Sequence, residues 1–392
     1  MKKRKICIVV QRYGLEVNGG AEALTRMYAE RLKDWYDVLV VTTKALDYMT
    51  WEDWYTADEE TINGVKVRRF SLEREKDMDA FQEINDRFMQ MDMEEDEEPE
   101  WIDSQGPYVP GMIRWLKEHY DDFECFLFFT YLYYPTVIGL PEVKDKAILI
   151  PFAHDEPFLS MSAYRRLFES PRAILFSTQE ERQLIRMKFE NYNIPCLIGG
   201  AGVTVPSDVS AERFEKKYGL KNFILYVGRI DAGKNCEELF EDFSIYKEEY
   251  PSSLKLVLMG KEVIEVPKRD DVVSLGFVDE QDKFDGLAAC DLLVLPSKYE
   301  SLSMVVLEAF KMDKPVLVNG QCEVLKAHCD HSHGGLAYLD RKEFFKHLYY
   351  LEKNPDVRRE MGRNGRAYVR ENYQWETIML KLSDLIEEVC GG

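Results

Sequence analysis

A basic loop in the second half of the chain has the residue types of a diphosphate clamp. The apolar run Phe223–Val227 leads into the sequence GRIDAGKN (228–235) and then into a helical pattern. Arg229 offers a planar fork and Lys234 a point charge to phosphate oxygens, and the helix start adds its dipole. The loop therefore predicts a diphosphate site, with an ordinary polar loop as the alternative.

Two glutamates, Glu300 and Glu308, follow another apolar run, Asp291–Leu295. A rise of 1.5 Å per helical residue would separate two positions eight residues apart by ~12 Å. Paired glycosidase carboxylates lie only ~5–9.5 Å apart, so these two acids are not expected to share one bond-breaking event. They suit hydrogen bonds to hydroxyls at two ends of an elongated ligand. Backbone N–H groups from Ser301 to Ser303 would point at the same ligand.

Two loops in the first half also carry candidate residues. Gly20 lies near the end of a loop (11–22) that finishes with Asn18-Gly19-Gly20-Ala21-Glu22 at the start of a helix, where a glycine lets the backbone approach an anion. The pattern is not G-x-G-x-x-G, so the dinucleotide fingerprint is absent. His154 follows the apolar run Ala147–Pro151 and could donate a hydrogen bond to a sugar or phosphate. A structural turn and a structural histidine are the alternatives.

The elements that must position these residues alternate between short apolar runs and amphipathic stretches, as in helices covering a parallel sheet. In the first half we expect strands at Ile6–Val10, Asp37–Thr42, Val65–Phe70, Phe126–Phe129, Ala147–Pro151, Ala173–Ser177 and Cys196–Ile198. In the second half we expect Phe223–Val227, Leu254–Met259, Val272–Leu275, Asp291–Leu295 and Pro315–Val318. The glycine-containing segment 199–220 would connect two doubly wound α/β domains, and ligands would bind beyond the carboxyl ends of the strands.

Residues 71–110 depart from this alternation. They hold an acidic run (94–98), then Trp101 and the sequence QGPY (105–108). One interpretation is a solvated surface excursion, in which the acidic run 94–98 is an exposed, mobile element outside both cores. The other is a lid or acceptor-shaping insertion, because Trp and Tyr beside Gly-Pro are typical of carbohydrate-contacting loops.

Composition excludes several classes of function. The 392 residues carry a formal net charge of −20, which disfavours nucleic-acid binding through phosphates, since that takes a basic face. No stretch approaches the ~18 apolar residues of a membrane span. The eight cysteines form no C-x-x-C pattern, which fits a reducing cytoplasm. The spacing in Cys322–His333 does not match a structural zinc site, so we expect a polar loop there.

Taken together, these motifs resemble the retaining GT-B glycosyltransferases of group 1 (glycosyltransferase family 4). The resemblance rests on Gly-Gly-Ala-Glu at 19–22, the G-R…K-N loop at 228–235, the E-x₇-E pair Glu300 and Glu308, the turn Gly276-Phe277-Val278 and the carboxyl-terminal Tyr373-Gln374-Trp375-Glu376. It covers nearly the whole chain. It implies two Rossmann-like domains facing a cleft, 1–205 and 206–373, with a helix at 374–392 crossing back to complete the first domain.

The resemblance also implies a role for each candidate residue. The assignments are donor diphosphate for Arg229, Lys234 and Gly20; donor sugar for Glu300, Ser301, Leu302 and Ser303; ribose for Glu308; base for Phe277 and Val278; and the reacting centre for His154 and Glu300. No metal and no cofactor are expected, because the Arg/Lys pair and a helix dipole take up the charge of the leaving diphosphate.

The implied activity is transfer of a sugar, with retention, from a nucleotide-diphosphate sugar to a saccharide-type acceptor. The acceptor would be a glycan, a lipid-linked saccharide or a glycoprotein of bacterial surface synthesis, and the enzyme cytoplasmic, with room for peripheral membrane contact. A catalytically silent partner-binding subunit and a GT-B epimerase or phosphorylase are the alternatives. Two positions depart from the family pattern: Leu302 replaces the usual aromatic residue, and Gly260-Lys261-Glu262 replaces a Gly-x-Gly. Both leave the bound sugar and nucleotide open.

Overall fold

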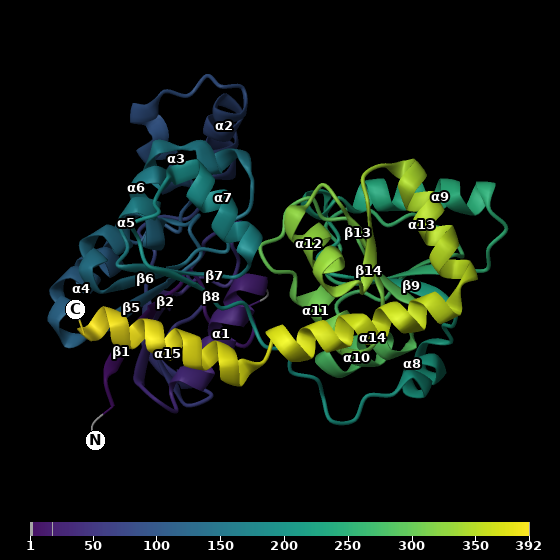
Figure 1. Ribbon diagram of the computed structural model, residues 1–392. Coiled ribbons are helices and arrows are strands. Elements are labelled where there is room, and N and C mark those ends of the chain that lie inside the picture. Colours follow the sequence, from purple (N-terminus) through teal and green to yellow (C-terminus); the bar gives the residue numbers. More distant parts are fainter. Residues whose placement is uncertain (1–2, 18, 392) are drawn as a thin grey trace. The chain divides into compact units, whose positions relative to one another are not determined.

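The computed structural model describes residues 3–17 and 19–391, and the chain forms two compact units (Figure 1). Unit 1 comprises Met1–Gly200 and Glu376–Gly392, and unit 2 comprises Ala201–Trp375. Our predicted boundaries, 205/206 and 373/374, lie a few residues from these. Both units are α/β with a parallel sheet, the doubly wound class expected from the sequence.

Unit 1 is built on an eight-stranded sheet of order β3-β4-β2-β1-β5-β6-β7-β8, parallel except for the β3–β4 pair. The strands are β1 Lys5–Val9, β2 Asp37–Thr43, β3 Glu59–Ile62, β4 Val65–Phe70, β5 Cys125–Phe129, β6 Ala147–Ile150, β7 Ala173–Phe176 and β8 Cys196–Ile198. β3 is polar and was missed. The turn that joins it to β4 uses Asn63 and Gly64 in the left-handed region, as such hairpins require.

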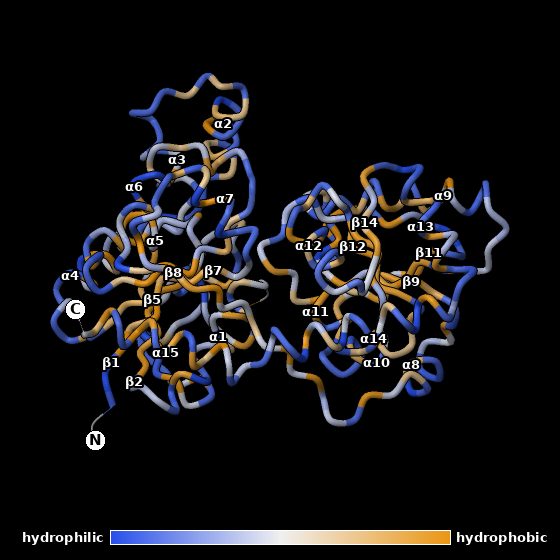
Figure 2. Tube along the Cα trace, in the orientation of Figure 1, coloured by the Kyte–Doolittle hydropathy of each residue, from blue (hydrophilic) through white to orange (hydrophobic). Residues whose placement is uncertain are grey.

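The helices of unit 1 pack apolar faces on this sheet, whose central strands are the hydrophobic interior of the unit (Figure 2). They are α1 Gly20–Leu32, α2 Met78–Met89, α3 Glu98–Gln105, α4 Pro110–Glu118, α5 Tyr134–Glu142, α6 Ser162–Glu169, α7 Gln179–Phe189 and α15 Trp375–Gly391. Short 3₁₀ turns are η1 Glu95–Glu97, η2 Tyr120–Asp122, η3 Lys144–Lys146 and η4 Pro157–Ser160. The predicted carboxyl-terminal helix thus forms, and its buried face belongs to unit 1.

Part of the segment 71–110 is packed into the core of unit 1, which corrects the interpretation of the whole segment as a surface excursion. Trp101 is fully buried and packs against Phe81, Phe88 and Phe158, so it cannot contact a carbohydrate as the lid interpretation required. Glu98 is also buried, and its carboxylate accepts hydrogen bonds from Ser162 N (2.7 Å) and Ala163 N (2.9 Å) at the start of α6. Within the acidic run, Glu94, Glu95 and Asp96 are exposed and Glu97 is half-buried.

Unit 2 is built on a six-stranded parallel sheet of order β11-β10-β9-β12-β13-β14. Its strands are β9 Phe223–Val227, β10 Lys255–Met259, β11 Val272–Ser274, β12 Leu292–Leu295, β13 Val316–Asn319 and β14 Gly335–Tyr338. Its helices are α8 Ala211–Tyr218, η5 Ala232–Lys234, α9 Cys236–Glu249, α10 Glu280–Ala289, α11 Met304–Lys311, α12 Glu323–Ser332, α13 Arg341–Lys353 and α14 Pro355–Asn372. The polar loop expected at Cys322–His333 is instead helix α12, because a buried face of Leu325 and His328 packs inward.

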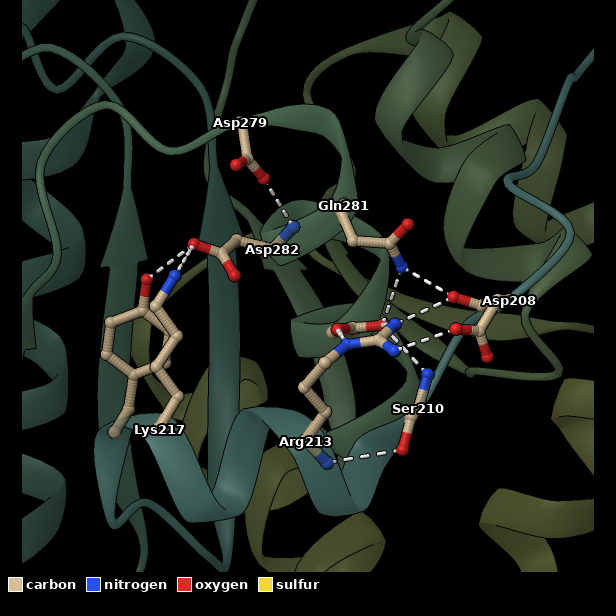
Figure 3. Close-up of polar contacts among 9 residues, drawn as sticks. Asp208, Ser210, Arg213, Lys217, Asp279, Gln281 and Asp282 are labelled. Carbon is tan, nitrogen blue, oxygen red and sulfur yellow. Dashed lines mark hydrogen bonds and ion pairs between the residues drawn. The ribbon is translucent and has the colours of Figure 1, made fainter.

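A carboxylate network fastens the start of unit 2 to its core (Figure 3). Asp285 of α10 is buried and accepts hydrogen bonds from Ser210 N (2.7 Å) and from the guanidinium of Arg213 (2.5 and 2.8 Å) in α8. Burial alone would raise the pKa of Asp285, but these hydrogen bonds outweigh it and lower that pKa. The network holds the connecting segment 201–210 onto the α8–α10 layer.

Candidate functional site

Neighbouring parallel strands bring the candidate loops of unit 2 to one edge of its sheet. β10, β9 and β12 are adjacent, so the loops that leave their carboxyl ends start side by side. Gly228 and Gly260, the first residues of two of these loops, both have φ of 155°. A Cβ on Gly260 would lie 1.8 Å from the carbonyl oxygen of Gly228. Only glycine permits this close approach, which brings the two loops into contact.

The basic loop 228–235 is stabilised from within by Asp231. Its carboxylate accepts a hydrogen bond from Lys234 N (2.8 Å) and caps the 3₁₀ turn η5, while its other oxygen contacts Arg229 Nε. The Arg229 side chain is nearly half exposed. The loop thus presents a guanidinium and an ammonium on a fixed backbone, which suits an anionic group.

Lys234 and Glu300 meet directly, although 66 residues separate them. Lys234 Nζ lies 2.7 Å from Glu300 Oε1, and both side chains are largely buried. The pair joins the loop after β9 to the loop after β12. The predicted phosphate-binding lysine and the predicted sugar-binding glutamate therefore occupy one site, as neighbouring parts of a nucleotide sugar would require.

The loop from Ser297 to Ser303 carries two buried hydroxyl groups. Neither Ser297 Oγ nor Ser303 Oγ has a hydrogen-bond partner within residues 3–17 and 19–391. Ser303 adopts a left-handed conformation (φ 62°) at the start of α11, without capping that helix through its side chain. The side chain of Leu302 is buried in the core, so only its backbone is available to a ligand. Unpaired buried hydroxyls are costly and suit a polar ligand.

Glu308 lies one turn inside α11 and pairs with a residue that sequence reasoning missed. Lys283 Nζ from α10 lies 2.8 Å from Glu308 Oε1. Burial raises the pKa of Glu308, and the charge of Lys283 opposes that rise. The contact uses one carboxylate oxygen and leaves the second for a ligand hydroxyl.

The turn Gly276-Phe277-Val278 precedes α10, the helix that supplies Lys283. Gly276 is left-handed (φ 67°), and its carbonyl accepts a hydrogen bond from Gly260 N (2.8 Å). Phe277 is 71% exposed, which is unusual for a phenylalanine and leaves its ring available for stacking. Val278 is half-buried beside it.

The candidate residues of unit 1, Gly20 and His154, lie beyond the carboxyl ends of β1 and β6, and β5 lies between these two strands in the sheet. Thr130 and Phe152, just past β5 and β6, are both left-handed non-glycine residues, and such strain gathers at functional sites. His154 follows Phe152, and its Nδ1 lies 3.6 Å from the carboxylate of Glu156. Glu156 in turn accepts a hydrogen bond from the Tyr131 hydroxyl.

Glu181 fastens the loop that carries His154, and the sequence did not reveal this role. Glu181 N donates a hydrogen bond to Thr178 Oγ1 (3.1 Å), which caps the start of α7. Its carboxyl group, however, accepts hydrogen bonds from Ala153 N and Ser177 N, both at 2.6 Å. Complete burial raises the pKa of Glu181 to about 8, against the lowering effect of these hydrogen bonds.

Open space lies above the amino-terminal end of α1. A Cβ added to Gly20 would meet no atom within 4 Å. Below it, Glu22 forms a buried ion pair with Arg12 (2.5 Å) and accepts a hydrogen bond from Gln11 (2.9 Å). Gln11 also accepts a hydrogen bond from Thr130 (3.2 Å), so this network ties the β1 loop to the β5 loop. Asn18, which we included in the glycine motif, lies outside the described residues.

The predicted site residues thus divide between the units. Gly20 and His154 belong to unit 1, and all the others belong to unit 2, where Lys234 and Glu300 are in contact. Within residues 3–17 and 19–391, no three His, Cys, Asp or Glu side chains are grouped to hold a metal ion. Over the same residues, no helix has the length and apolar character needed to span a bilayer.

Curated relatives match about half of the chain. One is alpha-monoglucosyldiacylglycerol synthase of Acholeplasma laidlawii, 24% identical over 216 residues, which are 47% of this chain and 54% of that protein. Another is N-acetyl-alpha-D-glucosaminyl L-malate synthase of Bacillus anthracis, 26% identical over 194 residues, 45% of this chain and 49% of that protein. The chain spans about half the length of each.

Solved structures match along the whole chain. Sucrose-phosphate synthase from Thermosynechococcus elongatus has a TM-score of 0.71 at 16% identity, covering 99% of both chains. HepE of Anabaena, solved with UDP and glucose, has a TM-score of 0.70 at 14% identity, covering 98% of this chain and 100% of that one. These likenesses show that the chain has the GT-B fold, as the sequence predicted.

The family model "Glycosyl transferases group 1" matches residues 210–368, nearly all of unit 2. The match includes the 228–235 loop, the Lys234–Glu300 pair and the Glu308–Lys283 pair. Unit 2 is therefore a group 1 glycosyl transferase domain, in a chain of GT-B fold.

Proposed function

We propose that the protein transfers a sugar from a nucleotide-diphosphate sugar to a saccharide-type acceptor, with retention of anomeric configuration. The contact between Lys234 and Glu300 carries the proposal, because it places a phosphate-binding cation beside a hydroxyl-binding carboxylate. Arg229 in the same loop supplies a second cation. The matched group 1 domain, and the UDP and glucose in the HepE structure, support this class of donor.

The basic pair would act mainly on the leaving group. Breaking the bond between sugar and diphosphate concentrates negative charge on the departing phosphate oxygen. Arg229 and Lys234, already fixed by Asp231 and Glu300, would stabilise that charge more in the transition state than in the ground state. Since these cations do the work of a metal ion, we propose that transfer needs no metal. Activity that survives exhaustive chelation would support this, and loss of activity restored by Mg²⁺ or Mn²⁺ would contradict it.

Other donor contacts would follow the geometry of unit 2. Glu300 and the backbone of Ser301, Leu302 and Ser303 would hold the sugar. Glu308 would accept hydrogen bonds from the ribose hydroxyls with the oxygen that Lys283 leaves available. Phe277, exposed beside Val278, would stack on the base.

The acceptor side would lie in unit 1, at the carboxyl ends of β1, β5 and β6. Gly20 would approach the donor phosphates through its backbone, and His154 would face the reacting centre. For His154→Ala we expect turnover to fall by ~10² or more with donor affinity changed only a few-fold. His119→Ala, in a histidine that packs on Trp115 away from these strand ends, is the control. Near-normal turnover in His154→Ala would return His154 to a structural role.

As the acceptor we propose a glycan, a lipid-linked saccharide or a glycoprotein of bacterial surface synthesis, made in the cytoplasm, with peripheral membrane contact where the acceptor is a lipid. The relatives named above include a monoglucosyldiacylglycerol synthase and an N-acetyl-glucosaminyl L-malate synthase. Such different acceptors on one donor domain fit an acceptor site in unit 1.

A thermal-shift screen tests the donor directly. The panel is uridine, guanosine, adenosine and thymidine diphosphates with their glucose or mannose conjugates. A ligand at 100 times its dissociation constant adds ~2.7 kcal/mol to stability. We expect one nucleotide family to raise the Tm, and Arg229→Ala to abolish the rise while Lys326→Ala, on the surface of α12, does not. A screen without any shift would contradict the proposal.

Product analysis then separates the mechanisms. Proton NMR of the first product should show the donor's anomeric configuration, and inversion would contradict the retaining assignment. Binding without donor hydrolysis or transfer to any acceptor would favour the silent partner-binding subunit. Conversion of the nucleotide sugar without an acceptor sugar would favour an epimerase, and phosphate-dependent cleavage a phosphorylase.

A further inference from the structure

The loop that holds Glu300 has little regular structure to fix it. Between the end of β12 at Leu295 and the start of α11 at Met304, the chain is irregular, and Ser303 is in a strained left-handed conformation. A donor-sugar site needs this backbone held closely, since small displacements of catalytic groups are costly. Something behind the loop must therefore anchor it.

His328 of α12 lies directly behind this loop. Its ring is 2% exposed, and Nε2 is 2.7 Å from the carbonyl oxygen of Leu302, two residues after Glu300. The other ring nitrogen, Nδ1, is 3.3 Å from the hydroxyl of Tyr368 in α14. Tyr368 Oη is in turn 3.1 Å from Tyr373 Oη. Four groups thus form one continuous hydrogen-bonded chain.

The direction of each bond in this chain follows from the carbonyl at its end. A carbonyl can only accept, so His328 Nε2 must carry a hydrogen and donate it. In the neutral ring Nδ1 then has no hydrogen and accepts one from Tyr368. With its hydrogen used, Tyr368 accepts from Tyr373. Burial lowers the pKa of His328 to about 4, which keeps the ring neutral near pH 7 and this direction fixed.

We propose that His328 is a positioning residue for donor-sugar binding, which it supports by holding the Leu302 carbonyl through a tautomer fixed by Tyr368 and Tyr373. The inference rests on the proposed function of Glu300 as the sugar-binding residue. His328 does not reach the ligand: its ring is buried, and both nitrogens are within hydrogen-bond distance of protein groups. It acts on the sugar only through the backbone of the loop.

The anchor also links the loop to the end of unit 2. Tyr373 is the C-cap residue directly after α14. It lies two positions before Trp375, where unit 2 ends. The bond chain therefore runs from the segment at which the chain leaves unit 2 to the loop that carries Glu300. A change of conformation at 373–375 would reach the donor loop through two hydroxyls and one imidazole.

Hydrogen exchange tests the anchor without any ligand. We compare the wild type with His328→Leu, which removes both bonds, and with His328→Gln, whose amide can still donate from the position of Nε2. Exchange in the peptide 299–308 should be at least 10-fold faster in His328→Leu and return most of the way in His328→Gln. His331→Gln, on the exposed side of the same helix, is the control. Unchanged exchange in His328→Leu would overturn the proposal.

Ligand binding and kinetics test whether His328 supports donor-sugar binding. The ligands are the nucleoside diphosphate that the wild type binds in the thermal-shift screen and its nucleotide sugar. His328→Leu should bind the free nucleoside diphosphate within 3-fold of the wild type, but lose ~10-fold in kcat/KM for the nucleotide sugar. Tyr368→Phe should show a smaller loss of the same kind, and His328→Gln should recover activity. Equal losses for both ligands, or no recovery in His328→Gln, would overturn the proposal.

Failure of the proposed function gives a different pattern. If the wild type binds no nucleotide sugar, the glycosyltransferase assignment fails, while hydrogen exchange still decides whether His328 anchors the loop. If His328→Leu does not fold, Tyr368→Phe and His328→Gln are compared with the wild type instead. Tyr368→Phe keeps the imidazole of His328, and His328→Gln places an amide where that imidazole was. In that case, Tyr368→Phe would overturn the role of the hydrogen-bonded chain if two quantities stayed at their wild-type values. These are the hydrogen exchange of the loop that carries Glu300 and kcat/KM for the nucleotide sugar.

Discussion

At the scale of single residues, the Lys234–Glu300 contact allows the two ends of the donor site to be separated. Arg229 and Lys234 would meet the diphosphate, which is present in both the nucleotide sugar and the free nucleoside diphosphate, whereas Glu300 would meet only the sugar. Removing a charge-assisted contact costs ~1.5–3 kcal/mol, roughly 10- to 100-fold in binding. Arg229→Ala should therefore weaken both ligands, as measured by calorimetry.

Glu300→Gln is the variant to compare with Arg229→Ala. Glutamine keeps an acceptor for Lys234 Nζ, so the loop should remain in place while the charge is lost. We expect weaker binding or slower turnover of the nucleotide sugar and nearly unchanged binding of the free diphosphate. A loss of free diphosphate as large as that in Arg229→Ala would disprove the assignment of Glu300 to the sugar.

The Glu308–Lys283 pair gives a second residue-scale prediction. Burial raises the pKa of Glu308, and Lys283 counteracts the rise. In Lys283→Met the carboxyl group should hold its proton to higher pH, so binding of the nucleoside diphosphate should weaken and recover as the pH rises. Calorimetry between pH 6 and pH 8.5 measures this. Lys298→Met, in a partly exposed lysine that pairs with Glu238, should leave the pH profile unchanged.

The candidate residues were predictable to the extent that their signal is local. The 228–235 loop and the E-x₇-E pair are visible in sequence because each motif is contiguous and adjoins an apolar strand. Lys283, Glu181 and His328 were missed, since each contacts a residue at least 25 positions away in the sequence. Nothing in the spacing of a lone Glu or His shows which distant backbone group it will bind.

At the scale of elements, Glu98 shows how an acidic run can be part of the core. Its buried carboxylate receives two backbone N–H groups and the Ser162 hydroxyl at the start of α6. Glu98→Ala would leave those donors unpaired and should lower the free energy of unfolding by ~1–3 kcal/mol in urea titrations. Glu100→Ala, on the exposed side of α3, should change it by less than ~0.5 kcal/mol.

Limited proteolysis checks the same element. We expect early cleavage between Gln90 and Glu97, where the chain is exposed, and protection from Glu98 to Gln105. First cleavage within 98–105 would show that α3 is not packed as described.

Most strands were predicted correctly because their apolar runs are short and bounded by turn residues. Those that form the sheet centres, such as β1 and β9, match to within a residue or two. β3 was missed because its residues, Glu59–Ile62, are mostly polar and pair only at the sheet edge. Helix α12 was mistaken for a loop because its buried face includes cysteine and histidine, which weaken the apolar period.

At the scale of the whole molecule, the two units should respond to pH in opposite directions. The folded-state pKa of His328 is about 4, below its ordinary value of 6.5, so between these values the unfolded chain of unit 2 binds more protons. Unit 2 should therefore lose stability as the pH falls through this window, by up to about 3 kcal/mol. Glu181 has a folded-state pKa of about 8, above 4.5, so unit 1 should lose stability as the pH rises through that window.

Hydrogen exchange in the central strands of each unit, followed from pH 5 to pH 8, measures both trends. His328→Gln should flatten the dependence in unit 2 alone, and Glu181→Gln should flatten it in unit 1 alone. If the two units showed the same trend, and neither substitution changed it, then other titratable groups would dominate the pH dependence of stability.

Helix α15 has a consequence for the order in which the two units fold during synthesis. It follows the whole of unit 2 in the chain, yet Ile378, Leu382, Leu385 and Ile386 are buried in unit 1, and Arg4 pairs with Glu387 (2.7 Å). Each such side chain contributes ~1.5–3 kcal/mol on burial, a large part of a domain's ~5–15 kcal/mol. On the ribosome, unit 2 is continuous and can fold as soon as it emerges. Unit 1, begun first, must wait with an apolar surface uncovered until α15 has been translated.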